Sequence, residues 1–488
     1  IIFNKGGNKM NALDKFFHLK ENHTDVKTEV IAGVTTFMTM AYILAVNPSI
    51  LSAAGMDNGA VFTATALASL IATVLMALFS NYPFALAPGM GLNAYFAYTV
   101  VINMGYTWEM ALAAVFIEGL IFILLSLTNV REAIFNAIPM SLKHAVSAGI
   151  GLFICFIGLQ NAKLVTNSDS TLVTIFSFKG SADSGTFFTE GITVLLAIIG
   201  VLITAILIVK KVKGHILLGI LATWILGIIC QLVGLYQPNA EMGFFSLLPD
   251  FSNGIAIPSL MPTLLALDFS RALSLDFFVV IFAFLFVDMF DTLGTLIGVS
   301  SKADMLDKDG KLPRIKGALL ADAVATSAGA LLGTSTTTTF VESSSGVAEG
   351  GRTGLTAITT AVLFLLAIIF SPLFISIPSF ATAPALIFVG FLMFTAVADI
   401  HFEDLTEAIP AYICILAMPI FYSIAETTQG IPAFICIIAM PFMYSISEGI
   451  AMGVISYVIL NLVCGKSKKI TPLMYILAVL FVLKYIFL

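Results

Sequence analysis

The sequence predicts an all-α polytopic membrane protein. Of its 488 residues 59% are hydrophobic and only 11% are charged, against roughly 25% charged in an ordinary soluble domain. The apolar residues gather in blocks of about twenty, the length that a helix needs to cross a hydrocarbon core of about 30 Å. Membrane barrel strands would instead alternate apolar and polar residues over short segments. These observations predict a bundle of transmembrane helices.

Clear apolar blocks and basic connections between them set the expected topology. Lysine and arginine are concentrated in every second connection, which favours a cytoplasmic amino terminus in the inner or plasma membrane. The long connections 160–190 and 236–270 are nearly free of basic residues and are expected outside. The blocks are 29–47, 61–79, 108–127, 140–159, 191–209, 215–235, 275–299, 355–375 and 472–487.

Composition and motifs exclude several functions. The net charge of −6 comes with no basic patch for nucleic acid. No Walker A pattern occurs, so an ATP-driven pump is not indicated. The five cysteines have no paired spacing, so neither a disulfide nor a metal is assigned to them, and no cofactor is expected. No cleaved signal peptide is expected at the amino end.

The C-terminal part contains a near-duplicate stretch. Residues 409–426 recur almost unchanged at 431–448, an offset of 22 residues. An extra crossing there would reverse the side on which the lysines at 466–469 emerge. We interpret 409–448 as a local duplication, and it leaves the number of spans after residue 400 open.

Two interrupted segments indicate a deeper, inverted repeat. One is broken at Pro88–Gly91 and the other by the polar run Thr334–Gly346, and each is the third hydrophobic segment of its half. Seven spans precede residue 275, so the second half would enter from the opposite side. Broken helices at matching positions of inverted halves indicate a substrate site near the membrane midplane.

The run 334–346 combines six hydroxyl-bearing residues at 334–339 with an acid at 342. Consecutive β-branched residues favour extended backbone, which is tolerated in a membrane only where it lines a cavity. We therefore expect Thr336–Phe340 to be extended and Glu342–Val347 to begin a half-helix. The alternative is a polar helix that packs through its Ser and Thr side chains.

The other two candidate segments carry an amide and a pair of acids. Asn93 lies where a helix restarts after the Pro-Gly break, and it offers donors and acceptors to a heterocycle; a structural interhelical amide is the alternative. Asp288 and Asp291 are three residues apart on the eighth span, a costly placement that suggests a transport pathway. We expect one, Asp291, to be structural. The role of Glu118 in the fourth span, structural or functional, is left open. Asp322 and Glu349 are expected to be solvated or paired near span ends.

Four stretches of the sequence resemble those of a known family. The stretches GVTTFMTMAYILAVNP (33–48), GMGLNAYF (89–96), FVDMFDTLGTLIG (286–298) and TSTTTTFVESSSGVAEGGRTGLTA (334–357) are similar to the AzgA-like purine permeases of the second nucleobase–cation symporter family. The resemblance implies two inverted seven-span repeats, about 14 transmembrane segments, with discontinuous third and tenth spans. It also implies core and gate domains. Their expected bounds, after a cytoplasmic segment 1–28, are 29–128 and 261–376 for the core, and 129–260 and 377–488 for the gate.

The resemblance also implies the residues of the site. The base would contact Asn93, Asp288 and Glu342, with Asp291 nearby, and the proton would be coupled through Glu342, Asp288 and Asp291. Further expected substrate contacts are Gly91, Thr292, Phe340 and Ser343.

The expected function is import of a purine base by proton symport, with guanine or hypoxanthine preferred over adenine. The expected partners are the base, a proton and the lipid bilayer, with a homodimer allowed for. An adenine permease of the same family is the first alternative. An anion carrier related to sulfate transporters is the second, although no buried Arg or Lys accompanies the acids. An intramembrane hydrolase is the third, but its paired acids would not lie on one helix turn.

Overall fold

The computed structural model describes residues 13–128, 140–168, 172–239, 242–249, 257–302, 305, 312–399, 454–455, 457–459, 462, 467 and 470–487. The duplicated stretch 409–448 lies outside these residues, so the number of spans there stays a prediction.

Helices dominate the described chain. In its first half they are α2 (Val26–Met40), α3 (Ile43–Ser52), α4 (Asn58–Ser80), α5 (Met90–Ala94), the π-helix η1 (Tyr95–Asn103), α6 (Trp108–Leu127), α8 (Met140–Asn161), α9 (Phe178–Asp183), the π-helix η2 (Phe187–Gly191), α10 (Ile192–Val209) and α11 (His215–Leu232). In its second half they are α12 (Leu275–Lys302), α13 (Ile315–Leu332), α14 (Ser343–Ala348), α15 (Gly354–Ala367), the 3-10 helix η4 (Ile368–Phe370), α16 (Ser371–Ile375), α17 (Ser379–Phe394), the 3-10 helix η5 (Thr395–Asp399) and α21 (Pro472–Phe487).

The expected apolar blocks all lie on helices. Within the described residues, eight helical segments are long and apolar enough to cross a membrane, and shorter apolar helices lie at Ser379–Phe394 and Pro472–Val482. This confirms a multi-pass helical membrane protein, while the arrangement of about 14 spans in two inverted repeats stays a prediction. The long segments are Val26–Ser52, Asn58–Ser80, Trp108–Leu127, Phe187–Val209, His215–Leu232, Asp276–Leu296, Ile315–Leu332 and Gly354–Ile375.

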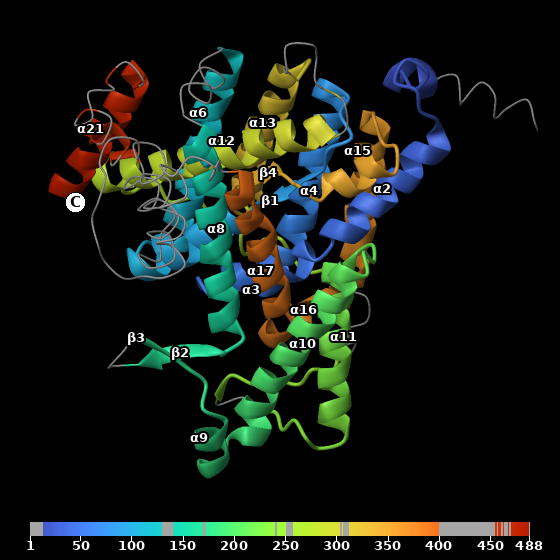
Figure 1. Cartoon of the computed structure of the whole chain (residues 1–488), viewed down its shortest axis with the longest axis vertical. Coiled ribbons are helices and arrows are strands. Elements are labelled where there is room, and N and C mark those ends of the chain that lie inside the picture. The colour runs from blue at the N-terminus through green and yellow to red at the C-terminus, as the bar shows by residue number, and fades with distance from the viewer. Residues whose placement is uncertain are drawn as a thin grey trace, which may run out of the picture.

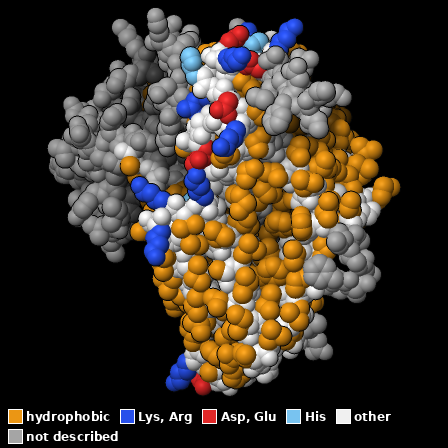
Figure 2. Space-filling view, turned by 90° about the vertical axis from the view of Figure 1, so that its right-hand side faces the viewer, with side chains coloured by type: hydrophobic (Ala, Val, Ile, Leu, Met, Phe, Trp, Pro, Cys, Tyr) orange, Lys and Arg blue, Asp and Glu red, His pale blue; other side chains and the backbone are white. Residues whose placement is uncertain are grey.

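The outer surface has the character that a bilayer requires. Large apolar side chains such as Leu202 and Ile206 of α10, Ile229 of α11 and Leu365 of α15 are exposed. Figure 2 shows that hydrophobic side chains cover a broad area of one face, while most lysines and arginines in this view lie near the upper end and along one edge, with a few charged side chains at the lower end. A surface this apolar is stable against lipid, where it needs no water.

Two short strands, β1 (Leu86–Pro88) and β4 (Thr337–Thr339), meet among the helices in the upper half of the view in Figure 1, and we call the place where they meet the crossing. They pair antiparallel, with Ala87 opposite Thr338. The expected extended run Thr336–Phe340 is thereby confirmed, and α14 begins after Glu342 as expected. Pairing the strands satisfies backbone groups that would otherwise face an apolar interior without partners. A second hairpin, β2 (Val165–Ser168) with β3 (Leu172–Ile175), lies in the long connection after α8.

The described helices pack in two groups. In one group α13 lies against α4 and α6, and α15 against α2 and α4; in the other α17 lies against α8, α10 and α11. Glycines allow the close approach in the second group, because a Cβ on Gly390 would lie 2.6 Å from the backbone N of Cys155 on α8. The first group contains β1 and β4. The bounds of the core and gate domains themselves stay a prediction.

Candidate functional site

The crossing of β1 and β4 requires a glycine. Gly89 donates its backbone N–H to the carbonyl of Thr336 at 3.0 Å. A Cβ at Gly89 would lie 2.5 Å from Cγ2 of Thr338 and 3.4 Å from Oδ2 of Asp291. Because real Cβ atoms do not approach that closely, only glycine lets the two broken segments and the acid meet here. The local Pro-Gly pair therefore both ends the strand and opens the space beside it.

Glu342 stands at this crossing, immediately before α14. Its Oε1 accepts a hydrogen bond of 2.6 Å from the hydroxyl of Tyr42, which lies in the turn between α2 and α3. Thr39 of α2 donates to its backbone carbonyl at 3.4 Å. The side chain is partly exposed. One carboxylate oxygen is thus held by Tyr42.

Behind the crossing, Asp288 lies in a buried network. Oγ1 of Thr292 is 3.1 Å from Oδ1 of Asp288, 2.8 Å from Oδ1 of Asp322 on α13 and 2.8 Å from Oγ1 of Thr338 on β4. Both aspartates are fully buried. A hydroxyl carries one proton, so Thr292 can donate to only one of these carboxyl groups at a time.

Asp291 has the more open position of the two acids on α12. It is partly exposed, lies beside Gly89 and Thr338, and is within electrostatic reach of Glu342 and Asp322. The expectation that Asp288 faces the substrate and Asp291 supports packing stays a prediction, and Asp291 is the more exposed of the two. Helix geometry explains why the two acids differ in exposure. A step of three residues turns the side chain by about 300° and leaves the two acids on neighbouring lines of one helix face.

Asn93 and Glu118 bond to the entry of the second broken segment. Oδ1 of Asn93 accepts a hydrogen bond from Ser335, and Oε2 of Glu118 accepts one of 2.8 Å from Thr336. Both side chains are fully buried. In this conformation Asn93 faces Ser335, so its role as a substrate contact stays a prediction. Glu118, left open by the sequence, belongs to the support of the crossing.

The other expected contacts surround the same crossing. Phe340 donates its backbone N–H to the carbonyl of Ala85 at 3.0 Å, and Oγ of Ser343 accepts from the N–H of Ala85 at 3.0 Å. Both residues are buried, as is Gly91 in α5. Ser343 and Phe340 therefore hold the two breaks together, and the structure brings Gly91, Thr292, Phe340 and Ser343 within the same region as the acids.

Sequence reasoning missed two of these side chains as parts of the site. Tyr42 belongs to the motif 33–48 but is not among the expected site residues. Asp322 is expected to be solvated or paired near a span end, whereas it is fully buried and bonded to Thr292. An acid within the apolar run of a span was the signal for Asp322. Nothing local distinguishes Tyr42 from other membrane tyrosines.

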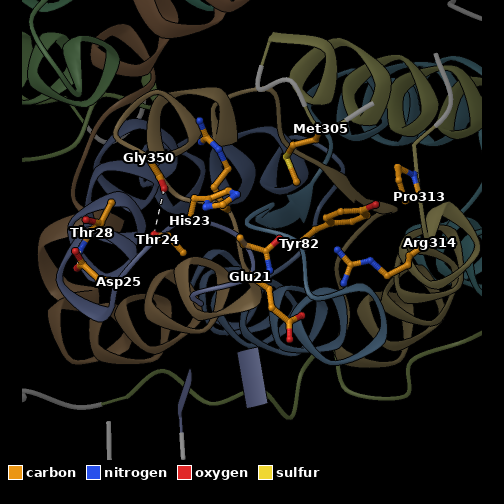
Figure 3. Close-up of a pocket in the computed structure, with 12 residues that line it drawn as sticks. Glu21, His23, Thr24, Asp25, Thr28, Tyr82, Met305, Pro313, Arg314 and Gly350 are labelled. Atoms are coloured by element: carbon orange, nitrogen blue, oxygen red, sulfur yellow. Dashed lines mark hydrogen bonds between the residues drawn. The ribbon is translucent and has the colours of Figure 1, made fainter. Parts of the chain in front are cut away.

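A cavity of about 760 Å³ lies elsewhere, between the segment before α2 and the start of α13. Its lining includes Glu21, His23, Tyr82, Arg314 and Gly350 (Figure 3). The guanidinium of Arg314 lies over the Tyr82 ring, 4.9 Å from its centroid. None of the expected site residues is among those that line this cavity. Within the described residues no His, Cys, Asp and Glu group has the arrangement of a metal site.

Known proteins similar to this chain include named permeases. Residues 27–430 match the model of the Permease family (Xan_ur_permease). The chain belongs to this family. The chain is 46% identical to the guanine/hypoxanthine permease PbuG of Bacillus subtilis, over 97% of this chain and 99% of that one. It is 41% identical to the adenine permease AdeP of Escherichia coli, over 97% and 96% of the two chains.

A solved structure shares the fold of this permease. The transmembrane domain of a cyanobacterium bicarbonate transporter, BicA, superposes with a TM-score of 0.58 over 88% of this chain and 97% of that one. The two sequences are only 17% identical, so this likeness concerns the fold alone.

Proposed function

We propose that this permease is a secondary transporter that imports a purine base together with a proton. The observation that carries the proposal is the similarity, over nearly the whole chain, to permeases named for guanine, hypoxanthine and adenine. The acids beside the β1–β4 crossing supply a chemical reason. A purine presents ring N–H groups that a carboxylate accepts and a flat face that an aromatic ring such as Phe340 can cover.

The proposed binding site uses Glu342 and one acid of α12. Oε1 of Glu342 is held by Tyr42, so its other oxygen is the acceptor for the base. Asp288 or Asp291 would accept a second N–H group, with Thr292 and Ser343 as hydroxyl partners and Asn93 acting at the restart of α5. Buried hydrogen-bonding groups of this kind discriminate strongly against an analogue that leaves them unpaired.

Guanine or hypoxanthine is proposed over adenine on likeness. Identity is 46% to the guanine/hypoxanthine permease and 41% to the adenine permease. The fold shared with a bicarbonate transporter suggests an anion carrier as the second candidate. The described side chains at the crossing are acids, hydroxyls, an amide and aromatic rings, which favour a neutral base over an anion.

The test is uptake of radiolabelled hypoxanthine into vesicles that contain the purified protein and an imposed pH gradient. Unlabelled guanine and hypoxanthine should compete best, adenine less, and uracil and bicarbonate least. Absence of hypoxanthine, guanine and adenine uptake at every pH would refute the purine proposal. Bicarbonate uptake instead would establish the anion carrier.

Proton coupling is tested at Glu342. Glu342→Gln keeps the size and one acceptor of the side chain but cannot carry the charge, so we expect it to lose accumulation driven by a pH gradient while exchange of base for base survives. A charge that crosses the full potential gains about 2.3 kcal/mol per 100 mV, enough for accumulation of roughly fiftyfold. If the variant still concentrates hypoxanthine with normal pH dependence, Glu342 is not the coupling acid and Asp288 or Asp291 takes that role.

A further inference from the structure

A buried tyrosine from the first span is bonded to the central acid of the site. Tyr42 is 1% exposed, and its hydroxyl lies 2.6 Å from Oε1 of Glu342. A carboxylate can only accept hydrogen bonds, so the phenol is the donor when Glu342 is charged. Bonds from a donor to a charged acceptor are about twice as strong as neutral ones. Tyr42 therefore stabilises one orientation and one charge state of Glu342.

The position of the Tyr42 hydroxyl is fixed by packing on its N-terminal side. The helix α2 packs directly on α14. This is seen at Gly346, where an added Cβ would lie 2.6 Å from the backbone oxygen of Ala32. Oγ1 of Thr39, three residues before Tyr42, lies 2.8 Å from the carbonyl of Thr36 in its own helix and 3.4 Å from the carbonyl of Glu342. Tyr42 and Glu342 thus lie next to two segments that pack closely against each other.

The C-terminal side of Tyr42 is anchored to the second broken segment as well. Asn47 of α3 is fully buried, and its Nδ2 donates to Oγ1 of Thr334 at 2.9 Å and to Oγ1 of Thr65 at 2.7 Å. The turn that carries Tyr42 is therefore tied to both ends of the segment 334–342. A side chain held from both directions can select the rotamer of its partner at little cost in entropy.

We propose that Tyr42 is the positioning residue of the substrate site: it holds Oε1 of Glu342 so that the second oxygen faces the base, and it sets the pH at which transport is fastest. This inference rests on the proposed function.

Several other titratable groups lie near Glu342. Asp291 of α12 lies within electrostatic reach of both Tyr42 and Glu342. Asp288 and Asp322 lie behind Thr292. The remaining charged groups packed against α14 lie at or beyond its far end, where Arg352 donates to the carbonyl of Val347, Glu349 pairs with Lys213, and Glu29 accepts from the backbone of Arg352. Tyr42 is thus a neutral hydrogen-bond donor to Glu342 in a region that also contains several acids.

The experiment compares Tyr42→Phe with Tyr82→Phe in vesicles. Both variants remove one hydroxyl from a tyrosine that is 1% exposed, and Tyr82 lies beside Arg314 in the separate cavity, away from Glu342. Tyr42→Phe should raise the KM for hypoxanthine about tenfold at an unchanged amount of protein and move the pH profile of uptake about one unit to higher pH, because the charged carboxyl loses its donor. Tyr82→Phe should leave both unchanged.

A second variant keeps the shape of the side chain and reverses the effect. A tyrosine analogue with a fluorinated, more acidic phenol at position 42 is a stronger donor and should move the pH profile to lower pH. In the Glu342→Gln background, where exchange of base for base survives, neither change at position 42 should move the pH profile of that exchange. A Tyr42→Phe profile and KM equal to wild type, or equal shifts from Tyr82→Phe, would overturn the inference while wild-type purine uptake still upholds the proposed function.

Discussion

Two acids three residues apart on α12 have different surroundings. Asp288 is fully buried and bonded to Thr292, whereas Asp291 is partly exposed beside Gly89. A fully buried acid contributes to packing, and a partly exposed acid can reach a ligand. The sequence alone favoured the opposite assignment, which stays a prediction until both are measured.

The two roles are separated by Asp291→Asn and Asp288→Asn. From the geometry we expect Asp291→Asn to change the order in which guanine, adenine and xanthine compete with hypoxanthine, at an unchanged melting temperature. Asp288→Asn should instead lower the melting temperature of the detergent-purified protein, since a buried network member costs about 1–3 kcal/mol when it loses its bond. A changed competition profile for Asp288→Asn alone would restore the original assignment.

At the scale of elements, the contact between α2 and α14 positions the acid of the site. The helix α14 has only six residues and contributes little stability by itself. It is held because Gly346 lets it rest on the backbone of Ala32 and the side chain of Thr36. Glycine is required there for close approach, at an ordinary backbone conformation.

Gly346→Ala should therefore be destabilising. The added Cβ would lie 2.6 Å from the carbonyl oxygen of Ala32, a backbone atom that cannot rotate away, and overpacking of this kind costs about 1–3 kcal/mol. We expect a lower melting temperature and a higher KM. The matched control is Gly294→Ala on α12, where no atom lies within 4 Å of the new Cβ. Equal melting temperatures for the two variants would show that α14 adapts freely.

At the scale of the whole molecule, an ion pair links the two groups of helices. Lys213 lies in the connection between α10 and α11, and Glu349 ends α14. Their side chains are 62% and 30% exposed, so the pair is worth about 0–1 kcal/mol. That is small for stability, but it changes the ratio of two transporter conformations by up to about fivefold.

Charge reversal tests whether this pair biases transport. Lys213→Glu alone should change the initial rate of hypoxanthine uptake two- to fivefold, more at low salt because the charges are exposed. Combining it with Glu349→Lys should restore the rate. The control swap is Lys163→Glu with Glu190→Lys, a pair 2.6 Å apart within one group of helices. If the single reversal changes nothing at low salt, or the double swap does not recover, the pair plays no part in the movement.

Much of this architecture follows from the sequence by itself because its causes are local. A run of about twenty apolar residues must be a helix in lipid, so the spans could be predicted. Pro88, Gly89 and the β-branched run 336–339 disfavour a helix wherever they are placed, so both breaks, and the half-helix after Glu342, were also predictable. The acids of the site could be named because a carboxyl group within an apolar span is costly wherever it falls.

The tertiary structure alone decided which of these local features meet. Leu86 pairs with Thr339 and Tyr42 bonds to Glu342 across about half the chain, and no local preference of either partner selects the other. Asp322 became part of the network because α13 packs on α4 and α6 and turns that residue toward Thr292. Burial and hydrogen bonding depend on neighbours that are distant in sequence, so the side that each acid faces was determined only when the helices packed.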